Sequence, residues 1–278
     1  MTTTLRPTGP VQEGADGAKS RAYDVCDNGR PVGAVEIGTD RDFGASAGVL
    51  RSLGIAEPSR RRGRGTIAVL AAEEVLRGWG CTQVRAEVPE GDEAAMGLLT
   101  ALGYTERSRN MAKDLAAPPR ALPEGVIARP MTAEEYAPWR AAGIESYARS
   151  WIDRGVPAEQ ALRKARSDDA RSLPDGRHTE GAHFHVLVHG GEVVGQIWVT
   201  VRDTGRGEPA GYVYDVEVRE EHRGRGLGRA LMEQAERINL DAGARVLALH
   251  VFAENTPALR LYESLGYRTT RYNLAKRL

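Results

Sequence analysis

The sequence predicts a mixed α/β protein built from two tandem copies of one unit, with the upstream copy truncated. Three motifs recur along the 278 residues about 162 residues apart, which indicates an internal duplication. They are a glycine-turn hairpin (around Gly33 and Gly195), a glycine-rich loop and a Leu-Gly-Tyr ending. In each copy, strand-like runs alternate with helix-like segments, so we expect a mixed sheet with helices packed on it.

Four parts are expected along the chain. Residues 1–20 carry Thr, Gly, Pro and scattered charges and are expected to be flexible, although Leu5–Pro7 suits a short edge strand. Residues 21–116 form the upstream copy. Residues 117–124 contain three prolines and are expected to be a linker. Residues 125–278 form the downstream copy.

The upstream copy opens with a hairpin, because Asn28-Gly29 between two apolar runs is a strong turn signal. A basic loop follows the third strand, and Gly78 and Gly80 stop the helix after it. The expected elements are strands over 23–26, 31–37 and 48–55, a helix over 67–77, a strand over 84–88, a helix over 93–102 and a strand over 104–115.

The downstream copy repeats this order and adds two helical segments between Ala133 and Leu173 that have no upstream counterpart. Thr256 is a good N-cap for the last helix, with Pro257 at the first helical position. The expected elements are strands over 126–129, 184–189, 192–199 and 212–218, a helix over 227–241, a strand over 246–252, a helix from 256 to 266 and a strand over 267–274.

Composition argues against several functions. The 38 basic and 38 acidic side chains balance, so there is no net basic field for nucleic acid or an anionic membrane. No apolar run is long enough to span a membrane, and the N-terminus lacks a signal-peptide core, so a cytoplasmic protein is expected. The two cysteines, Cys26 and Cys81, are expected to be reduced and buried. A monomer and a homodimer both remain open.

The loop Arg223–Gly228 is the strongest candidate for a binding site. Its alternating glycines allow close backbone approach, and the helix that follows directs the positive end of its dipole at the same place. Such a loop suits a phosphate or pyrophosphate, although it is neither a Walker loop nor a dinucleotide motif. Taken alone, it is equally typical of a tight connection between a strand and a helix.

Two stretches, Val218–Gly228 and Asn255–Tyr267, together resemble the GCN5-related N-acetyltransferase (GNAT) superfamily, and this resemblance covers the whole downstream copy. Trp139, Tyr147 and Leu173–Gly176 are similar to one bacterial branch of it. The resemblance implies acetyl-CoA as acetyl donor. The residues that it implies for donor binding are Val216, Val218, Arg223, Gly224, Arg225, Gly226, Leu227, Gly228, Arg229 and Asn255.

The same resemblance implies that Tyr262 is the general acid. From spacing alone, Tyr262 belongs to an ordinary helical core stripe. Asp215 and Glu217 lie two apart on the central strand, so both face the same way if the strand is regular. One of them is a candidate general base or a partner for an ammonium group. Structural contacts to arginines are the alternative, and a bulge in this strand would break the alternation.

The expected acceptor is the primary amine of a small molecule. A protein or peptide amine is the first alternative, and a non-catalytic acyl-CoA-binding protein is the second. The candidates to line the acceptor site are Trp198, Tyr147, Tyr212, Tyr214 and His183, each of which also suits a core or rim position. His183 and His185 lack a third ligand at recognisable spacing, so no metal site is expected.

The upstream copy is expected to be degenerate. Aligning Arg62–Gly65 with Arg223–Gly226 places Ile67 at the position of Gly228, where a β-branched side chain would crowd a ligand. The same comparison places Asp92 at Asn255 and Leu99 at Tyr262. A structural or regulatory role is therefore favoured for this half. Tandem arrangements with one active half also occur in mycothiol synthases, but nothing in this sequence points to their substrate.

Overall fold

The computed structural model describes residues 2–15, 17–40, 44–116, 119–153, 157–203 and 208–278. The chain divides into two compact units, neither of which is continuous in sequence. The first unit consists of Met1–Met111, Val251–Leu259 and Thr269–Leu278, and the second of Ala112–His250 and Arg260–Arg268. The predicted mixed α/β class is confirmed, but these units differ from the contiguous domains that the sequence suggested.

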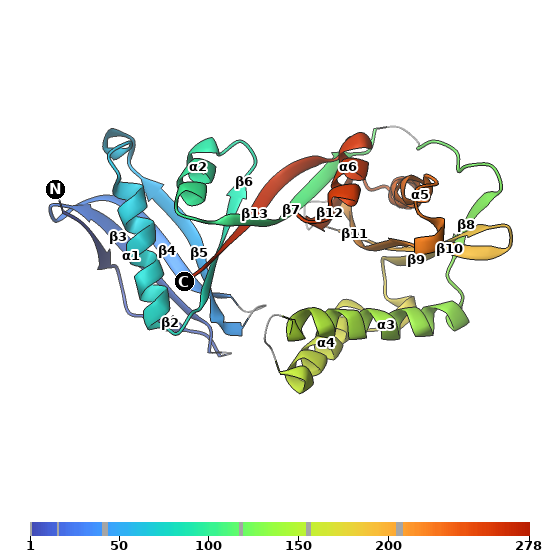
Figure 1. The fold of residues 1–278 in the computed structure, drawn as a ribbon, viewed down its shortest axis with the longest axis horizontal. Helices are drawn as coiled ribbons and strands as arrows, with labels where there is room; N and C mark the ends of the chain where they lie inside the picture. The colour runs from blue at the N-terminus through green and yellow to red at the C-terminus, as the bar shows by residue number, and fades with distance from the viewer. Residues whose placement is uncertain (1, 16, 41–43, 117–118, 154–156, 204–207) are drawn as a thin grey trace. The chain divides into compact units, whose positions relative to one another are not determined.

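The first unit is a mixed sheet whose strands follow the order β1-β3-β4-β5-β6-β13, with β2 paired to β3. All neighbours in this order are antiparallel except β5 and β6. Helix α1 covers one face of this sheet (Figure 1). Its elements are β1 (Thr3–Pro7), β2 (Gln12–Glu13), β3 (Lys19–Asp27), β4 (Arg30–Asp40), β5 (Gly44–Ile55), η1 (Glu57–Ser59), α1 (Arg64–Gly78), β6 (Gln83–Pro89), α2 (Glu93–Ala101) and β13 (Arg268–Arg277).

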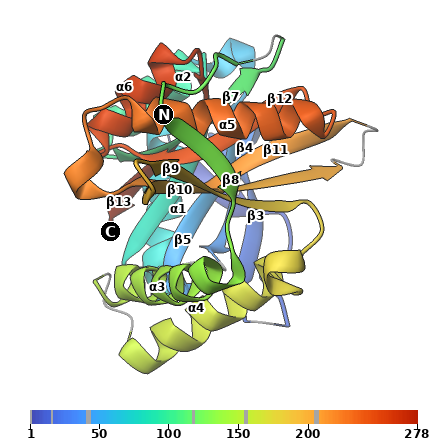
Figure 2. The ribbon, with the colours of Figure 1, turned by 90° about the vertical axis from the view of Figure 1, so that its right-hand side faces the viewer.

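The second unit is a sheet of order β12-β11-β10-β9-β8. Helix α5 lies on one face, and α3 and α4 lie together on the other (Figures 1 and 2). Its elements are β8 (Val126–Pro130), α3 (Ala133–Ile152), α4 (Ala158–Ser172), η2 (Gly176–His178), β9 (Ala182–His189), β10 (Glu192–Asp203), β11 (Pro209–Val218), η3 (Glu220–His222), α5 (Leu227–Asp241) and most of β12 (Val246–Phe252). Strand β7 (Thr105–Asp114) and α6 (Thr256–Ser264) contribute residues to both units.

The short edge strand suggested for Leu5–Pro7 is present: it belongs to β1, Thr3–Pro7, which pairs with β3. The apolar Leu5 in this edge strand packs against the core of the unit. In the described part of the upstream copy, no helix lies between β1 and β3, whereas α3 and α4 lie between β8 and β9. Of the expected linker, Ala117 and Pro118 lie outside the described residues.

Each unit includes residues from the last strand of the other copy: the first unit holds β13 from Thr269 onward, and the second holds the end of β7 from Ala112 onward. Strand β13 pairs with β6, and its Lys276 Nζ donates hydrogen bonds to both carboxylate oxygens of the buried Glu73 of α1, at 2.7 and 2.9 Å. In the second unit, Lys113 at the end of β7 donates to the buried Glu236 of α5 at 2.7 Å. This reciprocal exchange explains why the compact units are not contiguous in sequence.

Cys26 and Cys81 are both buried, as predicted. No helix among the described residues combines the length and apolar character that crossing a membrane requires.

Candidate active site

The edge of β11 separates from β12 near the middle of the second unit. The two strands pair in parallel over Gly211–Val213 and Leu247–Leu249, and within the described chain their pairing stops there although β11 continues to Val218. A β-bulge lies at this point, where Tyr214 is the extra residue against β10. The main chain beyond it, including Val216, is thus placed to pair with an extended ligand instead of a strand.

Asp215 and Glu217 lie on one face of β11, as the sequence predicted. The bulge precedes them, so the register is regular from Asp215, opposite Trp198, to Glu217, opposite Gln196. Burial raises the pKa of Asp215, and the charge of Glu217 adds to this effect. The exposed Glu217 accepts a hydrogen bond from Gln196 Nε2 at 3.0 Å. Among the described residues the side-chain hydrogen bonds of these two carboxylates come from Trp139 and Gln196, and no ion pair joins either one to an arginine.

Aromatic rings surround Asp215 on the face of the sheet that α3 covers. Trp198 and Tyr214 stack with centroids 4.5 Å apart, and Phe184 stacks on Trp198 at 5.8 Å. Trp139 of α3 meets Trp198 edge-on, and its Nε1–H donates to Asp215 Oδ2 at 3.0 Å. Tyr214 remains 45% exposed. We call Trp139, Phe184, Trp198 and Tyr214 the aromatic row.

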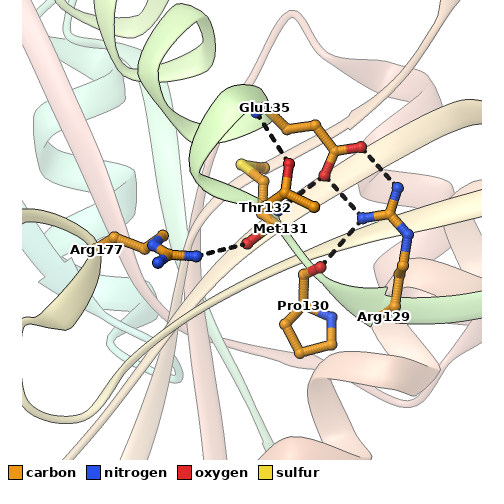
Figure 3. A network of polar contacts seen from close by, with 6 residues as sticks. All are labelled: Arg129, Pro130, Met131, Thr132, Glu135 and Arg177. Carbon is orange, nitrogen blue, oxygen red and sulfur yellow. Dashed lines mark hydrogen bonds and ion pairs between the residues drawn. The ribbon is translucent and has the colours of Figure 1, made fainter.

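The first turn of α3 is fixed by a polar network (Figure 3). Thr132 and Glu135 form a capping box, in which each side chain accepts from the backbone N–H of the other. Arg129 of β8 donates to both carboxylate oxygens of Glu135 at 2.7 Å, and this lowers the pKa of Glu135 to about 2. The network ties α3 to β8 and so holds Trp139 close to the sheet.

Tyr262 lies on α6, with its side chain buried. Burial, together with the negative charge of Asp215, raises the pKa of Tyr262 to about 12. The hydroxyl therefore keeps its proton at neutral pH. Since a free thiol has a pKa near 8.5, full proton donation to a thiolate would be uphill by about 5 kcal/mol, so a hydrogen bond is the favoured form of assistance.

The glycine loop has the geometry expected of a binding loop. Gly224 and Gly226 adopt φ of +77° and +78°, a conformation that side chains disfavour, and α5 begins directly after Gly226. At Gly228 a Cβ would lie 3.2 Å from Leu261 Cδ2, so α5 and α6 approach closely there. The backbone N–H groups of this helix start are suited to an anion.

The side chains of the loop have different environments. Arg223 Nε donates to Val218 O at 3.1 Å, and Arg229 donates to Ser264 Oγ at 2.6 Å. The side chain of Leu227 is buried, so Leu227 can contact a ligand only through its main chain. The side chain of Arg225 is exposed. These contacts hold the loop against β11 and α6 and leave Arg225 at the surface.

Asn255 caps α6: its Oδ1 accepts from the backbone N–H of Ala258 at 3.2 Å. The prediction of Thr256 as the N-cap is therefore wrong by one residue. Thr256 is the first residue of the helix, and the side chain of Asn255 before it accepts the hydrogen bond of the third helical residue, Ala258. In the upstream copy, Asp92 caps α2 in the same way, accepting from Ala95 at 2.9 Å. Asp92 and Asn255 therefore share one capping role at equivalent helix starts.

Two predicted acceptor residues lie apart from the aromatic row. Tyr147 contacts Trp151 of its own helix and Asp168 of α4, to which its hydroxyl donates at 3.2 Å. His183 faces the α5 side of the sheet, since His185 two residues later contacts Gln234 of α5. Tyr147 and His183 therefore lie outside the group of rings around Asp215, and their role in acceptor binding stays a prediction.

His183 instead lines a pocket of about 260 Å³ at the end of β8, together with Arg177, His178 and His185. Burial lowers the pKa of His183, which favours the neutral imidazole. Among the described residues, no group of three His, Cys, Asp or Glu side chains is arranged to hold a metal ion.

Comparison of the helix starts corrects the alignment of the two glycine loops. Helix α1 begins directly after Gly63, with φ of +74°, just as α5 begins after Gly226. Gly63 thus matches Gly226, and Gly65 matches Gly228; a Cβ on Gly65 would also lie close to a leucine, at 3.3 Å. The prediction that Ile67 replaces Gly228 is wrong. The sequence comparison aligned the two Arg-Gly-Arg-Gly runs with each other, and this alignment is shifted by two residues from the one that the helix starts give.

The upstream copy keeps the same backbone but not the same side chains. Strands β5 and β6 also pair over a short stretch, Ala47–Leu50 against Gln83–Ala86, and a bulge in β5 follows it at Arg51. The register across three strands places Ala22, Glu36 and Ser52 where the second unit has Phe184, Trp198 and Asp215. The aromatic row and its carboxylate are therefore specific to the downstream copy.

Other known proteins are similar to this chain in sequence and in fold. The profile of the Acetyltransferase (GNAT) family matches residues 4–104 and 144–267. The chain is 31% identical over 232 residues to the mycothiol acetyltransferase of Streptomyces scabiei, covering 80% of this chain and 70% of that protein. It is 29% identical over 150 residues to the uncharacterised N-acetyltransferase YdgE of Bacillus subtilis, covering 53% of this chain and 95% of YdgE.

Among solved structures, a tandem GNAT protein from the clavulanic acid biosynthesis pathway superposes with a TM-score of 0.55 at 22% identity. The match covers 94% of this chain and 83% of that one, and at this identity it shows the shared fold. The family match in two separate regions agrees with the duplication and with the paired glycine loops. The chain belongs to the acetyltransferase (GNAT) family and is an acyltransferase built from two tandem GNAT regions.

Proposed function

We propose that the chain is an acetyl-CoA-dependent N-acetyltransferase that acts on the primary amine of a small molecule through its downstream copy. One observation carries the proposal: β11 leaves β12 at the Tyr214 bulge beside Asp215, on the strand that leads into the glycine loop. An extended thioester arm fits along such an open strand edge, and a pyrophosphate fits the start of the helix behind the loop.

The residues present fit the donor. Gly224 and Gly226 leave open space where side chains would stand, and the main chain after Tyr214 lies beyond the pairing with β12. Acetyl-CoA supplies the activated acetyl group as a thioester. Arg225 is exposed next to the loop and is suited to a phosphate oxygen.

In the transfer step, the amine nitrogen forms a bond to the acetyl carbonyl carbon and the bond from that carbon to sulfur breaks. The amine attacks in its neutral form, so an acceptor that binds as an ammonium first releases one proton to water. The proton lost during the attack passes to Asp215, directly or through water, because its raised pKa makes it a better base than an ordinary carboxylate, and Asp215 then releases it to water. Tyr262, protonated at neutral pH, donates a hydrogen bond to the departing sulfur. A backbone N–H near Val218 is suited to the developing oxyanion.

Isothermal titration of the intact protein with acetyl-CoA tests the donor site. We expect one site per chain with micromolar affinity, followed by CoA release when primary amines are screened. The acceptor of the mycothiol acetyltransferases belongs in that screen, since those relatives are similar over most of this chain. No heat at several temperatures, with no thermal stabilisation by acetyl-CoA, would refute the proposal.

Two alternatives differ in the readout of the same experiment. Acetylation of added peptides, but of none of the small amines, would favour a protein or peptide acceptor. Binding of acetyl-CoA with no transfer to any amine would favour a non-catalytic acyl-CoA-binding protein. The buried Tyr262 beside Asp215 argues against the latter, because the upstream copy has Leu99 at the equivalent helical position.

A further inference from the structure

We propose that the aromatic row and Asp215 select one class of acceptor: a monocationic amine whose remainder is apolar or aromatic and carries no carboxylate or phosphate. In this arrangement Trp139 is a positioning residue that holds the Asp215 carboxylate in place. The inference rests on the proposed acetyl transfer and names the acceptor class of that same site.

Among the residues that the structure describes, Asp215 has no positively charged partner. Its contacts are the Trp139 indole N–H at 3.0 Å and the backbone N–H of Val216, both of which are neutral donors. Of the charged groups near it, Glu217 on the same strand is also negative, and Tyr262 is a neutral phenol. No lysine or arginine in the described part of the chain pairs with this carboxylate. An ammonium group would supply the missing charge.

The rings beside Asp215 suit such a cation. Indole and phenol faces attract ammonium groups electrostatically, and indole does so most strongly. Trp198 and Tyr214 present two nearly parallel rings, 17° apart, and Tyr214 is partly open to solvent. The same faces pack well against apolar or aromatic carbon, so the rest of an acceptor gains from lying along the row.

An acceptor with its own negative group is disfavoured here. Asp215 and Glu217 face the same side, and both would repel a carboxylate or phosphate. Arg140, one residue after Trp139, is already bound by Asp169 through contacts of 2.6 to 3.1 Å. Its charge is therefore compensated within α3 and α4.

Trp139 can hold Asp215 because α3 is itself fixed. The capping box of Thr132 and Glu135, tied to Arg129, sets the start of α3 one to two turns before Trp139 (Figure 3). Ring contacts with Phe184 at 5.2 Å and Trp198 at 5.8 Å then orient the indole. The N–H donor consequently points at Asp215 before any acceptor arrives.

Calorimetry with two matched probes tests the selectivity. Tyramine and tyrosine differ by one carboxylate, and each is titrated into the intact protein at pH 7.5 in the presence and in the absence of CoA. We expect tyramine to bind at least tenfold more tightly than tyrosine, and Asp215→Asn to remove most of this difference. Equal affinities, no detectable tyramine binding in either condition, or an unchanged preference in Asp215→Asn would overturn the inference.

The pH profile of kcat/KM tests the positioning role. A base acts in its ionised form, so the rate falls as pH drops through the pKa of Asp215. Trp139→Phe keeps a ring but removes the N–H that stabilises the carboxylate, so we expect the acidic limb to move to higher pH, with KM for acetyl-CoA unchanged. Trp151→Phe is the control: this tryptophan lies on the same helix but contacts Tyr147 and Lys164.

An unchanged limb in Trp139→Phe, or an equal shift in Trp151→Phe, would refute the role of Trp139. These outcomes are separate from those of the proposed function. Acetyl-CoA that fails to bind would refute acetyl transfer, while the tyramine titration without CoA would still report on the amine site.

Discussion

At the scale of single residues, burial and charge determine what each side chain of the site can do. Asp215 and Tyr262 both have raised pKa values, mainly because both are removed from water. The two shifts have opposite chemical consequences. A raised carboxyl pKa gives a stronger base, whereas a raised phenol pKa gives a weaker acid. Asp215 is therefore suited to take a proton, and Tyr262 to donate a hydrogen bond.

The substitution Tyr262→Phe tests this division of roles. We expect kcat to fall by about 100-fold, because the departing sulfur loses its hydrogen-bond donor, while the affinity for acetyl-CoA stays the same. Stopped-time assays of CoA release and calorimetry measure the two quantities. Tyr147→Phe serves as the control and should leave both unchanged, since Tyr147 contacts Trp151 and Asp168. Wild-type turnover in Tyr262→Phe would show that the hydroxyl has no catalytic role.

At the scale of elements, the two copies share the backbone geometry of the central strand and the glycine loop but differ in the side chains that these elements carry. Both have a short parallel pairing along the central strand, a bulge directly after it and a helix that begins after a left-handed glycine. In the upstream loop, Arg61 adopts φ of +58°, and the Arg64 guanidinium bonds to Asp27. The charge of Arg64 is therefore compensated by Asp27 within its own unit.

The paired substitutions Gly228→Ile and Gly65→Ile test which loop binds the donor. Both introduce a side chain at a helix start where a leucine of the next helix lies 3.2 to 3.3 Å from the added Cβ. We expect Gly228→Ile to weaken acetyl-CoA binding at least tenfold, because the loop and the start of α5 must shift. Gly65→Ile should have no such effect. Weaker binding in Gly65→Ile would mean that the upstream loop also holds the donor.

Sequence periodicity predicted most elements within a few residues, because strands and helices depend on local patterns of apolar side chains. It placed α5 over the same residues as the structure and gave β12 its full extent. Sequence periodicity did not predict contacts between residues that are far apart in the sequence. The pairing of Trp139 with Asp215 joins residues 76 apart, and no local pattern records such a pair.

At the scale of the whole molecule, the exchange of β7 and β13 makes each compact unit depend on both copies. In each unit a lysine from one copy lies on the last strand, a buried glutamate of the other copy lies on the helix, and a tyrosine ring is within 5.7 Å of the lysine. Burial, with the nearby glutamate, raises the pKa of Tyr104 and of Tyr267 in the same way. The two clusters thus have the same arrangement, and in each one the lysine comes from one copy and the glutamate from the other.

Lys113→Met and Lys276→Met test this dependence. Each leaves a buried glutamate without its partner, so we expect the free energy of unfolding to fall by about 3–5 kcal/mol in either case. Lys113→Met combined with Glu236→Met should recover much of the loss, since no buried charge then remains. Urea denaturation followed by circular dichroism measures both. Arg163→Met, which removes the exposed pair with Glu159, should cost under about 0.5 kcal/mol.

The sequence by itself determined the duplication, the α/β class, the glycine loop and the shared face of Asp215 and Glu217. These follow from repeats, from local periodicity and from the residues that tight backbone conformations require. Only the tertiary structure decided that Trp139 holds Asp215, that Gly65 matches Gly228, and that the copies exchange their last strands. Those outcomes depend on packing between distant segments, where shape and burial select the partners and neighbours along the chain carry no information about them.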